Sequence, residues 1–184
     1  MKKTLFIFFL QLFVFNIFSQ EGYRSGYVIT YNGDTIKGKI KDRKFVNNPV
    51  GWQKIDFINS SNGEKDKYTA DDIKEYYKMG TARYRSLALG VEEKKRFAEM
   101  LESSAIILFS YSLGLSQNSP FQYFLQKEKD VNSLMEWREA DYKKTAAFFF
   151  KDDKELVKSI ENEKLKYEDI QNIVKTYNDW KFRQ

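Results

Sequence analysis

The chain has 184 residues, with 31 basic and 26 acidic side chains, a formal net charge of +5, and neither cysteine nor histidine. The two absences exclude disulfide-stapled scaffolds, the usual zinc, haem and copper ligand sets, and cysteine or serine–histidine nucleophiles. We therefore expect no cofactor and no metal site, and only carboxylates, Lys, Tyr, Ser and Thr remain for chemistry.

The first 19 residues have the pattern of a signal peptide. Lys2 and Lys3 precede an apolar run over residues 5–18, which ends at the small residue Ser19. A retained transmembrane helix is the competing interpretation, but a bilayer span needs ~20 apolar residues and this run is shorter. We expect cleavage after Ser19, no membrane span in the remaining chain, and a location in the periplasm, at the outer membrane or outside the cell.

The mature chain has a mild and mixed charge. Without Lys2 and Lys3 its formal net charge is +3, and basic and acidic residues interleave along it. Nucleic-acid binding favours a larger basic excess with exposed stacking aromatics, so no nucleic-acid partner is expected. The lysines at 37, 39 and 41 are typical of a solvated strand face that resists edge pairing.

Two Asn-Gly pairs predict β-hairpins. A two-residue turn at Asn32-Gly33 would place Val28 opposite Lys37 and Tyr27 opposite Gly38. One face of this hairpin would then hold Tyr27, Ile29, Ile36 and Ile40, with Gly38 leaving space for the Tyr27 ring. The second turn, at Asn62-Gly63, would place Phe57 opposite Tyr68 and Asp56 opposite Thr69. Residues 47–51 are expected to form the loop between the hairpins.

Further strands are expected after the second hairpin. A short helix is predicted first, with Thr69 as its N-cap and Asp72 in the capping-box position. The strands are then predicted at residues 76–78, 83–89, 96–101, 105–111 and 121–126. Residues 130–137 fit either one more strand or the lead into a helix.

The last part of the chain changes to helical spacing. Apolar residues recur at this spacing over 142–149, 156–160 and 170–177, which predicts about three helices. Asp152 with Glu155 is a capping box for the middle helix, and Glu168 and Asp169 suit the first turn of the last. The fold class is therefore α+β: residues 20–137 form an antiparallel sheet that could be barrel-like, and residues 138–184 form helices packed on it.

Four stretches show a family resemblance: GYVITYNGDTIKGKIKDRKFVNNP, YTADDIKEY, YRSL and YKKTAAFFFKDDKELVKSIENEKLKYEDIQNIVKTYN. The chain resembles, over nearly all of its mature length, an uncharacterised family of exported, envelope-associated proteins from Gram-negative bacteria. The resemblance implies export and an envelope setting, but no activity and no site residues. Many members of that family have a cysteine-proline pair where Asp153-Lys154 stand here.

Aromatic residues are the candidate ligand contacts. Trp52 in the first long loop, together with Tyr76, Tyr77 and Tyr84, could form a surface on which a sugar or a peptide stacks. The competing interpretation is that these rings pack across the sheet, as strand aromatics commonly do.

The acidic pairs Asp71-Asp72 and Asp152-Asp153 are interpreted as helix caps because adjacent carboxylates point in different directions on a helix. No catalytic residue is therefore assigned, and the sequence favours a non-enzymatic binding or accessory module of the periplasm or envelope, with a protein or glycan as partner. Two alternatives stay open. One is a carboxylate-dependent hydrolase of glycans, using acids such as Asp56, Asp71 or Glu102. The other is a structural subunit of an outer-membrane complex.

Overall fold

A computed structural model describes residues 22–42, 54–90, 94–112 and 120–184. The expected signal peptide, the loop expected at 47–51 and Trp52 lie outside the described residues. Ten strands come first in the described chain: β1 (Arg24–Thr30), β2 (Thr35–Asp42), β3 (Lys54–Asn59), β4 (Lys65–Thr69), β5 (Ile73–Lys78), β6 (Arg83–Leu89), β7 (Lys94–Ser103), β8 (Ile106–Ser112), β9 (Phe121–Lys127) and β10 (Asp130–Trp137). Four helices follow: α2 (Tyr142–Phe149), α3 (Lys154–Glu161), the short 3-10 helix η3 (Tyr167–Asp169) and α4 (Ile170–Phe182).

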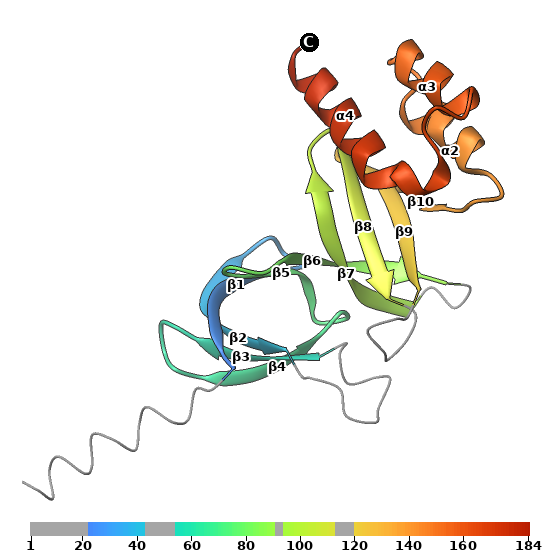
Figure 1. Cartoon of the computed structure of the whole chain (residues 1–184). Coiled ribbons are helices and arrows are strands. Elements are labelled where there is room, and N and C mark those ends of the chain that lie inside the picture. Colours follow the sequence, from blue (N-terminus) through green and yellow to red (C-terminus); the bar gives the residue numbers. More distant parts are fainter. Residues whose placement is uncertain (1–21, 43–53, 91–93, 113–119) are drawn as a thin grey trace, which may run out of the picture.

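The strands form one antiparallel sheet in the order β10-β9-β8-β7-β6-β5-β1-β2-β3-β4. Figure 1 shows β1 to β5 curled at one end of the sheet and the helices gathered over β8 to β10 at the other. This confirms the predicted α+β class and the order of sheet before helices. Among the described strands, β10 and β4 are the two edges, so the sheet is open and not the barrel-like form that the sequence suggested.

The predicted register of the first hairpin is wrong by one residue. Val28 lies opposite Ile36 and Tyr27 opposite Lys37. The cause is a three-residue loop: the Thr30 amide donates to the Asp34 carbonyl at 2.9 Å, and Gly33 has a φ of +92°. Because side chains alternate between the faces of a strand, the shift turns Val28 into the core in place of Tyr27 and Ile29, and Val28 is fully buried.

Gly38 was predicted to leave space for the Tyr27 ring. In the structure it leaves space for the Phe57 ring instead. A Cβ atom added at Gly38 would lie 2.3 Å from the Phe57 ring and 2.4 Å from the Ile58 carbonyl oxygen. Phe57 belongs to a buried cluster that fills the curl of the first strands. Its buried members are Val28, Ile40, Ile55, Phe57, Ala70, Ile73, Tyr76 and Phe97.

The second hairpin pairs two residues away from the predicted register. Phe57 lies opposite Asp66 and Ile55 opposite Tyr68, because the loop between Asn59 and Glu64 has four residues and not two. A shift of two residues keeps each side chain on its face. The Phe57 and Tyr68 rings therefore still meet, as a diagonal pair with centroids 5.6 Å apart.

The short helix predicted after Thr69 is absent from the described chain, where β4 passes through a tight turn into β5. Asp72 nevertheless makes the expected contact: its carboxylate accepts from the Thr69 amide at 2.7 Å and from the Thr69 hydroxyl at 2.6 Å. These bonds lower the pKa of Asp72. The capping-box pattern thus stabilises a turn here, since the same local bonds serve both structures.

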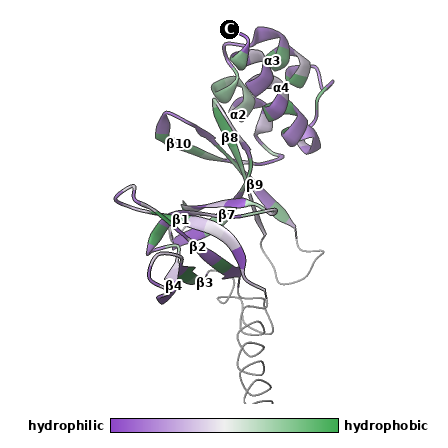
Figure 2. Cartoon of the chain, turned by 90° about the vertical axis from the view of Figure 1, so that its left-hand side faces the viewer, coloured by the Kyte–Doolittle hydropathy of each residue, from purple (hydrophilic) through white to green (hydrophobic). Residues whose placement is uncertain are grey.

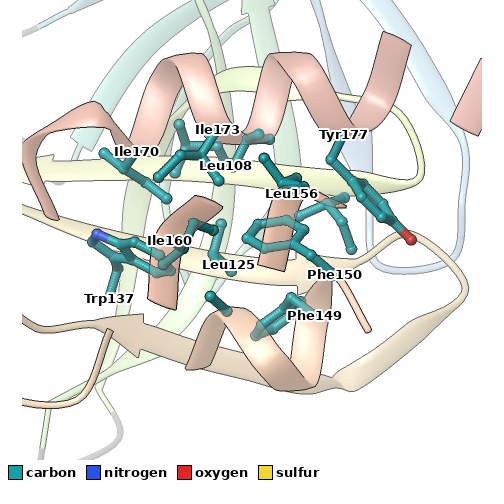
Figure 3. Close-up of a cluster of buried hydrophobic side chains, with 13 residues drawn as sticks. Leu108, Leu125, Trp137, Phe149, Phe150, Leu156, Ile160, Ile170, Ile173 and Tyr177 are labelled. Carbon is teal, nitrogen blue, oxygen red and sulfur yellow. The ribbon is translucent and has the colours of Figure 1, made fainter. Parts of the chain in front are cut away.

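All the strands predicted between residues 76 and 126 are confirmed, and residues 130–137 form the strand β10. β8 begins with the apolar residues 106–109, whereas α3 and α4 alternate hydrophobic and hydrophilic residues (Figure 2). The apolar stripes of the helices pack on one face of β8 to β10 (Figure 3). The buried residues of this helix-side core include Leu108, Leu125, Trp137, Phe149, Phe150, Leu156, Ile160, Ile170, Ile173 and Tyr177.

Candidate functional site

A pocket of about 490 Å³ opens at one end of the helix-side core. Its volume falls within the range of small-molecule sites in proteins. The β7–β8 turn, the β9–β10 turn, the α2–α3 connection and the end of α4 meet around it. It is lined by Ser104, Ala105, Ile106, Lys127, Glu128, Lys129, Phe149, Lys151, Asp152, Tyr177, Lys181 and Phe182, and we call it the lysine pocket.

Asp152 enters the pocket because it does not cap a helix. Asp153 is the N-cap of α3, and its carboxylate accepts from the Leu156 amide at 3.0 Å. The prediction that Asp152 caps this helix is therefore wrong by one residue. Asp152 instead reaches α4, where it accepts from the Tyr177 hydroxyl at 2.7 Å and from the Lys181 ammonium at 2.5 Å.

These contacts keep Asp152 ionised. Burial alone would raise the pKa of this carboxyl, but the hydrogen bonds from Lys181 and Tyr177 outweigh burial and lower it. Burial, followed by the bond to Asp152, raises the pKa of the Tyr177 hydroxyl. Tyr177 is therefore a neutral donor at neutral pH, and Asp152 is not a proton donor for catalysis.

Positive charge exceeds negative charge in the pocket. Four lysines face two carboxylates, a balance of +2, and Lys181 already neutralises Asp152. The Lys127 ammonium lies 4.1 Å from the centre of the Phe148 ring, a cation–π contact. Lys129 and Lys151 are exposed and make no ion pair within the described part of the chain. An anion in the pocket would thus meet cations that have no acidic partner.

The floor of the pocket is apolar. Ile106, Phe149 and Tyr177 are buried, with at most 4% of their surfaces exposed. Figure 3 shows the Tyr177 hydroxyl pointing away from the core cluster to which its ring belongs. Phe182, at the end of α4, is 90% exposed. The pocket therefore combines an apolar floor, an exposed aromatic ring and a cationic rim.

The structure brings together only two of the predicted aromatic residues among those it describes, Tyr76 and Tyr84, and it does so inside the sheet and not as a ligand surface. Tyr76 is only 3% exposed, and its ring stacks on that of Tyr84 with centroids 4.7 Å apart. Burial raises the pKa of both hydroxyls, that of Tyr84 to about 12. Tyr77 follows Tyr76 in β5 and so lies on the opposite face, 5.4 Å from the Tyr27 ring. Trp52 lies outside the described residues.

The candidate acids do not line the lysine pocket either. Asp56 is in β3, Asp71 in the β4–β5 turn and Glu102 in β7. Glu99 in β7, which was not among the candidate acids, lies opposite Tyr84 of β6. Burial raises the pKa of Glu99. Over the described ranges, no three Asp or Glu side chains gather as metal ligands would.

A second charged cluster lies within the sheet. Glu75 in β5 is 2% exposed and forms ion pairs with Arg83 and Arg85 of the neighbouring strand β6, the latter at 3.1 Å. Arg85 also donates to Gln126 in β9 at 3.3 Å. Each charged group of this cluster is paired with another of its members. The cluster therefore joins strands and offers no unpaired charge to a ligand.

Sequence reasoning missed the lysine pocket. Two local signals were present: Lys127 precedes a turn that contains Lys129, and Tyr177 and Lys181 lie four residues apart on one face of a helix. Neither signal tells which turn meets which helix end, because that contact depends on packing between distant segments.

Comparison with family models, with curated proteins and with solved structures finds no match to this chain. In the residues that the structure describes, no helix has the length and apolar character that a bilayer span requires.

Proposed function

We propose that this protein is an exported, non-enzymatic binding module of the periplasm or cell envelope, and that the lysine pocket holds an anionic group of its ligand. The observation that supports the binding site is the cationic rim over an apolar floor, in which Lys129 and Lys151 have no acidic partner within the described chain. Envelope proteins and glycans, the partners that the sequence suggests, both offer carboxylates or phosphates.

The state of Asp152 does not favour catalysis in the pocket. Glycosidases pair one carboxylic acid of raised pKa with one carboxylate. Asp152 has a lowered pKa and is engaged by Tyr177 and Lys181, so it cannot supply the acid. The pocket therefore fits the binding of an anion better than the hydrolysis of a glycosidic bond.

Titration with soluble anions tests the proposal. Inorganic phosphate and a short alkyl phosphate are added to the isotope-labelled protein while amide resonances are recorded. We expect saturable shifts at residues 127–129, 151–152 and 177–182, larger with the alkyl phosphate because its chain covers the apolar floor. The double variant Lys129→Gln/Lys151→Gln should lose most of the response. The variant Lys37→Gln/Lys65→Gln, which removes two exposed lysines from β2 and β4, should keep it.

Two results would contradict the proposal: no saturable shift, or equal losses in both double variants. The rival hydrolase has one observation in its favour, the raised pKa of Glu99 beside Tyr84. It predicts that the protein releases reducing sugar from envelope glycans and that Glu99→Gln stops the release.

A further inference from the structure

The mouth of the lysine pocket presents exposed aromatic rings next to cations. Phe182 is 90% exposed and Phe148 is 44% exposed. Phe182 follows Lys181 in α4, and the Lys127 ammonium lies against the Phe148 ring. Exposed phenylalanines flanked by lysines are typical of surfaces that lie at the boundary between lipid headgroups and acyl chains.

Phe182 lies at the pocket and Phe148 lies next to it, and neither ring is a member of a buried cluster in the described residues. Phe182 lines the pocket directly, while Phe148 adjoins the lining residue Phe149 with ring centroids 5.1 Å apart. Exposed single apolar residues are common on proteins, but here one lines the cationic pocket and a second contacts two of its lining residues, Lys127 and Phe149. A flat anionic layer with an apolar interior is complementary to this arrangement in both charge and polarity.

We propose that the pocket mouth binds the surface of an anionic lipid bilayer, with one phosphate-bearing headgroup among the lysines and the rings of Phe148 and Phe182 at the acyl boundary. This inference rests on the proposed function and names the ligand of the same pocket. Lysine side chains suit such a place because their apolar stems can lie along the aromatic rings while the ammonium groups stay at the level of the headgroups.

Vesicle sedimentation tests this inference. The processed protein is purified from the envelope, its N-terminus is read by mass spectrometry, and it is mixed with vesicles of phosphatidylcholine alone or of phosphatidylcholine and phosphatidylglycerol in equal parts. We expect binding to the mixed vesicles, weakening as salt rises, and little binding to neutral ones. Each lysine near an anionic surface strengthens binding about fivefold, so Lys129→Gln/Lys151→Gln should bind roughly 30-fold more weakly.

Matched variants separate the mouth from the rest of the surface. Phe182→Ser should weaken vesicle binding, whereas Met79→Ser, which removes another exposed apolar residue at the β5–β6 turn, should not. Lys37→Gln/Lys65→Gln should also bind as the unmodified protein does. Each variant is checked by circular dichroism, and the altered residues are exposed, so the fold should survive.

The outcomes distinguish the two proposals. Saturable shifts with alkyl phosphate but no binding to anionic vesicles would overturn the lipid inference and leave an anion-binding pocket for a soluble ligand. Vesicle binding that is equal in the pocket variants and their controls would also overturn it, because another surface would be responsible. If neither alkyl phosphate nor vesicles bind, the proposed function fails together with the inference.

Discussion

The side chain of Asn178 in α4 forms both backbone hydrogen bonds of Ile106 at the start of β8. Its carbonyl oxygen accepts from the Ile106 amide at 2.9 Å, and its amide nitrogen donates to the Ile106 carbonyl at 2.8 Å. Asn178 is 6% exposed, so water does not readily replace these bonds. The last helix is thus fixed to the sheet beside the lysine pocket, of which Ile106 is a lining residue.

We predict that Asn178→Ala destabilises the protein by about 2–3 kcal/mol, because it leaves the buried amide and carbonyl of Ile106 without partners. Urea unfolding followed by circular dichroism measures the loss. Asn172→Ala, at an exposed position of the same helix, is the control and should change stability by less than about 0.5 kcal/mol. Equal effects of the two substitutions would show that the contact with Ile106 contributes nothing.

Gly38→Ala should be strongly destabilising. The added methyl group would lie 2.3 Å from the Phe57 ring and 2.4 Å from the backbone oxygen of Ile58, and the backbone cannot move aside as a flexible side chain can. Overpacking of this kind costs about 1–3 kcal/mol. Gly90→Asn is the comparison, since Gly90 has a φ of +77° and open space around it. The prediction fails if Gly38→Ala unfolds at the same urea concentration as the unmodified protein.

The hairpins show how far the sequence determines the fold. The alternation of apolar residues and the Asn-Gly pairs located both turns correctly, but loop length decides register and is not encoded by the pair itself. Gly33 adopts a positive φ in the three-residue loop, as it would in a two-residue turn. Local sequence therefore identified the hairpin and not the face that Val28 occupies.

The helix starts show the same limit at the candidate site. Asp152 and Asp153 are both acceptable caps for α3, so the local pattern cannot choose between them. The choice follows from Tyr177 and Lys181, which engage Asp152 from α4, 25 and 29 residues away. The assignment of this cap therefore depends on contacts with α4 that the local sequence does not reveal.

Asp152 should contribute a small stability that depends on pH. Its pKa is lower in the folded than in the unfolded protein, so the contribution is present above the unfolded value, near 4, and is lost as the pH falls through the folded value. Because the Asp152–Lys181 pair is about 40% exposed, we expect a loss below about 1 kcal/mol for Asp152→Asn at pH 7.

Urea unfolding between pH 7 and pH 2 measures the difference between Asp152→Asn and the unmodified protein. The difference should shrink towards zero below pH 4. Asp179→Asn, which removes an exposed carboxylate from α4, controls for the change in net charge. A difference that stays constant down to pH 2 would contradict a role for the ionised Asp152 carboxylate.

Glu99 should have the opposite pH dependence. Burial between neighbouring strands raises its pKa, so the folded state binds this proton more tightly than the unfolded state does. Stability is then lost as the pH rises above the unfolded value, near 4. Glutamine carries no charge at any pH, so Glu99→Gln should gain stability relative to the unmodified protein as the pH rises from 4 to 7.

The measurement is the free energy of unfolding in urea at pH 4, 5, 6 and 7, with Glu161→Gln, an exposed position of α3, as the control for lost charge. The gain from Glu99→Gln should be smallest at pH 4, where the Glu99 carboxyl is largely protonated and so, like the glutamine that replaces it, carries little charge. A gain that falls as the pH rises would mean that the Glu99 carboxylate is stabilised in the folded protein. Such a carboxylate would have a cationic partner, and the raised pKa that favours the rival hydrolase would be lost with it.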